Sequence, residues 1–67
     1  MKFIFIKTNV GEVAYEKARI IKWTYDPEIN EMWITIRLTA TVWDSFKHFV
    51  EPADYESFKN TMKEMKE

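Results

Sequence analysis

The segment from Met32 to Trp43 constrains the fold more than any other part of the chain. Its even positions are all apolar, and its odd positions hold tryptophan, threonine and arginine. This alternation has the period of a β-strand, in which successive side chains point to opposite faces. The β-branched content of the segment also favours an extended backbone. We therefore predict a strand over residues 32–43, with its even face in the core and its odd face outside.

The residues before this strand predict its hairpin partner. The stretch Asp26–Glu31 contains proline and asparagine, which favour turns. A symmetric loop pairs apolar residues with apolar residues: Tyr25 with Met32, Trp23 with Ile34, and Ile21 with Ile36. Slipping the register by one residue would place Thr24 and Lys22 against the apolar row. We predict a strand over residues 12–25 that is bent or bulged around 17–19, although residues 12–19 also fit a helical stripe.

The N-terminal residues 2–8 are rich in phenylalanine and isoleucine, which favour a strand. Because apolar residues occupy both faces of this strand, we expect both faces to be covered. Asn9-Val10-Gly11 then predicts a three-residue hairpin loop, with glycine at the left-handed position. That loop pairs Phe5 with Tyr15 and Lys7 with Val13.

The C-terminal third predicts a short strand and a helix. Asp44-Ser45 suggests a turn into a strand over residues 46–50. Pro52 suits the first turn of a helix over residues 52–66, and Asp54 and Glu56 suit its N-terminus. The spacing of the apolar residues predicts one buried helix face, formed by Tyr55, Phe58, Met62 and Met65.

Together these elements predict a single α+β domain over residues 1–67. Its order is β-β-β-β-α, a small, strongly twisted antiparallel sheet packed by one C-terminal amphipathic helix. The simplest assembly buries the even face of the long strand under the helix, with Ile34, Ile36 and Leu38 against Phe58 and Met62.

Composition narrows the chemistry. The chain has 67 residues, no cysteine and one histidine, so we expect no disulfide, no structural metal and no cofactor. The net charge of −1 and the lack of a long apolar stretch favour neither a membrane nor a strongly basic nucleic-acid surface. We expect a cytoplasmic protein, and the residue usage is typical of short phage or mobile-element proteins.

No arrangement of residues indicates catalysis. Ser45 and His48 are three positions apart in a predicted turn and strand, so their side chains would point to opposite faces. The only glycine is Gly11, which excludes a glycine-rich phosphate loop. We therefore expect a protein that is not an enzyme, with no catalytic residues and no small-molecule substrate.

The odd face of the long strand is the candidate binding surface. It holds Trp33, Arg37 and Trp43, next to Lys22 of the partner strand, with Phe46 and His48 at its margin. Tryptophan and arginine are enriched at interface hot spots. We expect a non-enzymatic protein-interaction module, an adaptor, inhibitor or assembly component, that binds a protein partner or forms a homodimer.

Two alternatives remain at this point. The same Trp/Arg/Lys face could bind single-stranded nucleic acid, with bases stacked on the indoles and lysines near the phosphates. In a strongly curled sheet, Trp33 and Trp43 could instead close the two ends of one core.

Overall fold

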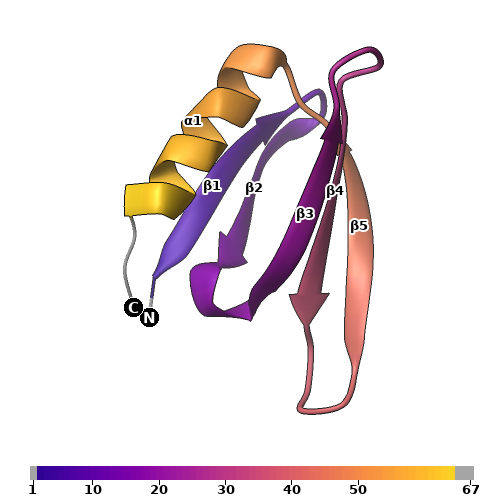
Figure 1. Cartoon of the computed structure of the whole chain (residues 1–67), viewed down its shortest axis with the longest axis vertical. Coiled ribbons are helices and arrows are strands. Elements are labelled where there is room, and N and C mark those ends of the chain that lie inside the picture. The colour runs from indigo at the N-terminus through magenta and orange to yellow at the C-terminus, as the bar shows by residue number, and fades with distance from the viewer. Residues whose placement is uncertain (1, 65–67) are drawn as a thin grey trace.

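The structure is a computed structural model that describes residues 2–64. Within these residues the chain has an α+β fold in which five antiparallel strands precede one helix (Figure 1). The elements are β1 (Phe3–Thr8), β2 (Gly11–Glu16), β3 (Ile20–Asp26), β4 (Glu31–Arg37), β5 (Trp43–Phe49) and α1 (Pro52–Glu64). A 3-10 turn, Lys17–Arg19, joins β2 to β3. The strands form a two-stranded sheet, β1-β2, and a three-stranded sheet, β3-β4-β5.

The β1–β2 hairpin turns through two residues, so the predicted three-residue loop is wrong. The observed pairs are Thr8 with Gly11, Ile6 with Val13 and Ile4 with Tyr15, in place of Phe5 with Tyr15 and Lys7 with Val13. The Thr8 hydroxyl donates to the Gly11 carbonyl at 2.6 Å and accepts from the Val10 N–H at 3.2 Å. These bonds hold the tight turn, and Gly11 adopts a φ of 122°, which only glycine tolerates without strain.

This register leaves one face of β1 uncovered. Ile4 and Ile6 are 2% and 1% exposed, whereas Phe3 and Phe5 are 49% and 62% exposed. The expectation that both faces of this strand are covered is therefore wrong for the single chain.

The β3–β4 hairpin has the predicted register over most of its length. Tyr25 pairs with Met32 and Trp23 with Ile34. A bulge at Ile21 then shifts the pairing, so that Ile20, and not Ile21, lies opposite Ile36. The sequence of residues 12–19 fitted either a strand or a helix. In the structure these residues form most of strand β2 and the 3-10 turn, so the strand prediction is correct.

The long strand ends at Arg37, six positions before its predicted end at Trp43. The N–H groups of Leu38 and Thr39 both donate to the Val42 carbonyl, at 2.8 and 3.0 Å. The Thr39 hydroxyl also accepts from the N–H of Val42 at 3.2 Å. Threonine hydroxyls that bond the nearby backbone favour a turn over a strand ladder. The chain therefore reverses through residues 38–42.

Strand β5 begins at Trp43, earlier than the predicted strand over residues 46–50. Asp44 and Ser45 lie inside this strand and do not form the predicted turn. Ser45 pairs with Thr35 of β4, and the two hydroxyls are hydrogen-bonded at 2.8 Å.

The core lies between the two sheets and the helix. Its buried residues are Ile4, Ile6, Met32, Ile34, Val50 and Phe58. Helix α1 begins at Pro52 as predicted, packs beside β1 in Figure 1, and buries Phe58, while its predicted end at residue 66 lies outside the described residues. Leu38 is 44% exposed, so the prediction that it packs under the helix is wrong.

Residues 2–64 include no helix with the length and apolar character needed to cross a membrane.

Candidate macromolecule-binding face

The three-stranded sheet has one face on the core and one face in solvent. Residues paired across antiparallel strands share a face, so the register assigns each side chain to one of them. We call the solvent side the outer face. It consists of Lys22, Thr24 and Asp26 from β3, Glu31, Trp33, Thr35 and Arg37 from β4, and Trp43, Ser45, Lys47 and Phe49 from β5.

Four of the six predicted site residues lie together on the outer face: Lys22, Trp33, Arg37 and Trp43. Trp33 and Trp43 are 41% and 59% exposed, and Arg37 and Lys22 are exposed as well. The alternative in which the two indoles close the ends of the core is therefore wrong.

The other two predicted residues, Phe46 and His48, are on the core side of β5. They pair with Ile34 and Met32, whose side chains are buried. Both contact Tyr15 of β2: its ring lies 6.4 Å from the Phe46 ring and 5.7 Å from the His48 ring. Because β5 begins at Trp43 and alternates from there, its even-numbered residues lie on the core side of the sheet, where Phe46 remains 38% exposed.

The His48 imidazole and the Tyr15 hydroxyl form a hydrogen bond of 2.5 Å that joins the two sheets. Partial burial lowers the pKa of His48 from its ordinary value of 6.5 and raises the pKa of Tyr15. Both shifts favour the neutral forms, because desolvation penalises a charged group. This pair is a structural link and not part of the outer face.

Sequence reasoning missed Lys47 and Phe49, which lie on the outer face beside Trp33. The Lys47 ammonium is 6.0 Å from the centre of the Trp33 ring and 5.6 Å from that of Phe49. It is also 4.0 Å from the Glu31 carboxylate, which accepts a 3.0 Å hydrogen bond from the Trp33 indole N–H. The signal was present in the sequence: an uninterrupted alternation from Trp43 to Phe49 would have placed both residues on this face.

Charge is unevenly distributed over the outer face. Its carboxylates, Asp26 and Glu31, face each other at the end near the β3–β4 turn. The opposite end holds Arg37, which pairs with Trp43 across β4 and β5. Asp44 pairs with Ile36 and therefore points to the other side of the sheet. The larger part of the face thus combines aromatic rings with cations.

A shallow depression of about 310 Å³ lies within this part of the face. It is lined by Lys22, Trp23, Thr24, Trp33, Thr35 and Ser45. Two indoles, an ammonium group and three hydroxyls therefore meet in one place. Such a set can stack a planar group, form hydrogen bonds to it and pair with a nearby anion.

In the part of the chain that the structure describes, no group of three or more histidine, cysteine, aspartate or glutamate residues could hold a metal ion. Comparison with known proteins finds no match to this chain among protein-family models, curated proteins or solved structures.

Proposed function

We propose that the outer face binds a nucleic-acid strand. One observation supports this proposal above the others: two indoles and three cations, Lys22, Arg37 and Lys47, share an open sheet face whose carboxylates lie at one end. Without Phe46 and His48, the predicted site keeps two indoles and two cations, and Lys47 adds a third cation. This favours an anionic partner with flat groups over a neutral one.

Bases would stack on Trp33 and Trp43, and phosphates would approach the cations between and beside them. Aromatic stacking contributes about 1–3 kcal/mol per base and tolerates any base. Trp43 lies beside Arg37, which is four residues from Trp33 along β4. At a rise of about 3.3 Å per residue the two rings are on the order of 13 Å apart.

A single strand suits this face better than a duplex. Its bases are free to stack, whereas bases in a duplex present only their edges in the grooves. The hydroxyls of Thr24, Thr35 and Ser45 line the depression beside Trp33 and offer hydrogen bonds to a base edge there.

The test is a fluorescence-anisotropy titration of a labelled oligothymidylate at low salt. Trp33→Ala and Arg37→Ala should each weaken binding by about tenfold, the effect of losing one stacked base or one charged contact. Phe5→Ala and Lys7→Gln, exposed residues of β1, serve as matched controls and should bind like the native protein.

Circular dichroism and thermal melting would show whether each variant is folded. Should Trp33→Ala unfold, Trp33→Leu and Arg37→Gln keep more of the local packing and repeat the comparison. Absence of binding by the native protein at low salt, or equal losses in the controls, would reject the proposal. Duplex DNA of the same sequence as a competitor measures the preference for single strands.

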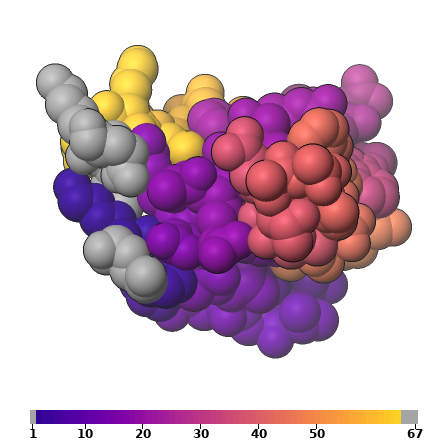
Figure 2. Space-filling model, turned by 90° about the horizontal axis from the view of Figure 1, so that it is seen from below, coloured from indigo at the N-terminus to yellow at the C-terminus, as the bar shows by residue number. Residues whose placement is uncertain are grey.

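A protein partner is the second candidate, because apolar surface continues from the outer face onto the β4–β5 loop. Leu38, Val42 and Trp43 are 44%, 49% and 59% exposed. Figure 1 shows this loop at one end of the three-stranded sheet, and in Figure 2, which views the molecule from that end, the loop faces the viewer. Contiguous exposed apolar residues are typical of protein interfaces. Under this candidate the chain is a non-enzymatic adaptor, inhibitor or assembly component, or it forms a homodimer. Its lack of cysteine is compatible with the cytoplasm, where disulfides are rare.

Light scattering after size exclusion separates self-association from the other possibilities. A homodimer through the loop should dissociate in Leu38→Ser and Val42→Ser, and the matched change Val10→Ser in the β1–β2 turn should leave it intact. A native monomer at every concentration would remove the homodimer.

A further inference from the structure

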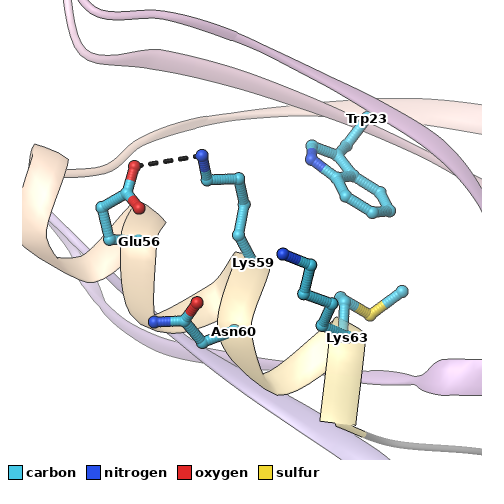
Figure 3. A pocket seen from close by; sticks show the side chains of 6 residues that line it. Trp23, Glu56, Lys59, Asn60 and Lys63 are labelled. Carbon is cyan, nitrogen blue, oxygen red and sulfur yellow. Dashed lines mark ion pairs between the residues drawn. The ribbon is translucent and has the colours of Figure 1, made fainter.

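A second cleft lies on the other side of β3, between that strand and α1. Its volume is about 370 Å³, and its lining is Trp23, Glu56, Lys59, Asn60, Met62 and Lys63 (Figure 3). Small-molecule sites generally have volumes of about 300–1,000 Å³, so this cleft fits a small ligand. No residue of the outer face lines this cleft; Trp23, which also borders the depression beside Trp33, pairs with Ile34 and points to the core side of the sheet.

The walls of the cleft are formed by an indole and a thioether side chain. Phe58 packs against the Trp23 indole at 5.0 Å between ring centres and 88° between planes, which holds the indole in place. Met62 packs against the same core from the helix. Indole and thioether groups both make favourable contacts with a flat aromatic ring. The walls therefore suit a ligand with an aromatic body.

Among residues 2–64, the rim of the cleft carries one positive charge without a partner. Lys59 forms an ion pair with Glu56 at 3.1 Å. The Lys63 ammonium makes no ion pair or hydrogen bond with any other residue in 2–64. Two lysines against one glutamate leave a single positive charge, which matches a monovalent anion.

Two hydrogen-bond donors face the same space. Figure 3 shows the Lys63 ammonium and the indole nitrogen of Trp23 turned toward the cleft. The Trp23 N–H has no acceptor among the described residues, and an indole N–H can only donate. A carboxylate can accept from both groups at once, because each of its oxygens carries two lone pairs.

We propose that this cleft binds a small aromatic carboxylate. Its ring lies between Trp23 and Met62, and its carboxylate accepts hydrogen bonds from Lys63 and from the Trp23 N–H. A dianion such as a phosphate monoester is disfavoured by the Glu56 carboxylate on the rim. The inference does not depend on nucleic-acid binding, since none of the tryptophans and cations proposed to contact a strand lines this cleft.

The test is an NMR titration of the ¹⁵N-labelled protein with 2-naphthoate. The chain has three tryptophans and so three indole N–H signals. Trp33→Phe and Trp43→Phe assign two of them and leave Trp23 by elimination, without disturbing the core. We expect a saturable shift of the Trp23 signal, with those of Trp33 and Trp43 unchanged.

Charge variants test the carboxylate contact. Lys63→Gln should weaken naphthoate binding about tenfold or more, the effect of losing a charged hydrogen bond. Glu56→Gln should tighten it several-fold, because Lys59 is then free. The matched control Lys47→Gln, on the outer face, should leave it unchanged. The neutral 2-naphthalenemethanol should bind at least tenfold more weakly than naphthoate.

Absence of a saturable Trp23 shift would overturn the proposal. Equal binding of the neutral alcohol, or an unchanged affinity in Lys63→Gln, would overturn the assignment of a carboxylate. Oligonucleotide binding by Lys63→Gln, measured in parallel, should equal that of the native protein, so failure of either proposal is visible separately.

Discussion

At the scale of single residues, the contact between Tyr15 and His48 makes stability depend on pH. The two side chains come from different sheets and share a hydrogen bond of 2.5 Å. Burial lowers the pKa of His48 in the folded chain below 6.5, the value for an exposed imidazole. The unfolded chain therefore takes up a proton at a higher pH than the folded chain does.

This difference predicts a loss of stability in mild acid. The free energy of unfolding should fall as the pH drops from about 7 through 6.5 and on to the lower pKa of the folded state, and this group should have no effect above about pH 7.5. His48→Gln cannot titrate, so its urea midpoint should change less between pH 8 and pH 5. His48 is the only histidine, so its NMR titration is unambiguous, and a midpoint at or above 6.5 would contradict the prediction.

At the scale of elements, α1 is attached to the sheets mainly through Phe58. Phe58 is the buried residue of the described helix, at 2% exposure, and it packs edge-on against Trp23. Phe5 of β1 is the same residue type but is 62% exposed. Comparing the same substitution at the two phenylalanines therefore measures the effect of burial on stability at constant residue type.

We expect Phe58→Ala to reduce the free energy of unfolding by about 3–5 kcal/mol, from lost apolar burial and the cavity that remains. Phe5→Ala should change it by about 0.5 kcal/mol or less, as is usual for exposed positions. Urea unfolding of both variants makes the comparison, with Phe58→Leu as a milder variant if Phe58→Ala does not fold. Equal effects of the two alanine changes would show that the helix is not held by this contact.

The sequence predicted best the elements in which apolar residues occupy one face over several successive positions. The alternation of Met32, Ile34 and Ile36 against Trp33, Thr35 and Arg37 identified the core face of β4, and it also set the β3–β4 register. Beyond Arg37 the pattern continues in the sequence but not in the structure. Thr39 has strong strand propensity, but its hydroxyl and the Leu38 and Thr39 N–H groups all bond to the Val42 backbone, which favours a turn.

The remaining errors come from shifts of one position in a turn and three positions in a strand start. A two-residue turn at Asn9-Val10 and a strand start at Trp43 each differ only slightly from the prediction. In a strand, however, a shift of one position exchanges the two faces. This is why Phe46 and His48 were expected on the wrong side and why Lys47 and Phe49 were missed.

At the scale of the whole molecule, a net charge of −1 coexists with a cationic patch. Lys22, Arg37 and Lys47 lie on the outer face, and the acidic residues of that face are at one end. Attraction to a polyanion is therefore local, and the rest of the surface opposes it at long range. Binding should accordingly be modest and sensitive to salt.

If the outer face contacts three phosphates of a single strand, the slope of log affinity against log salt should be about −2. Each of Lys22→Gln, Arg37→Gln and Lys47→Gln should make the slope less steep by about 0.7, whereas Lys7→Gln should not change it. Anisotropy titrations between 20 and 200 mM salt measure these slopes. A slope near zero in the native protein would mean that phosphates are not contacted.

The extra residue at Ile21 decides more than the local shape of β3. In a regular strand, Ile20 and Lys22 would share a side. Here Ile20 lies against the core and Lys22 lies in solvent, because the bulge at Ile21 exchanges the faces to which odd-numbered and even-numbered side chains point. If β3 kept Ile21 but ran without the bulge, a chain with Ile20 inside would have to turn Lys22 and Thr24 inward and Trp23 outward. That one change would take the indole out of the small-molecule cleft and a cation off the outer face.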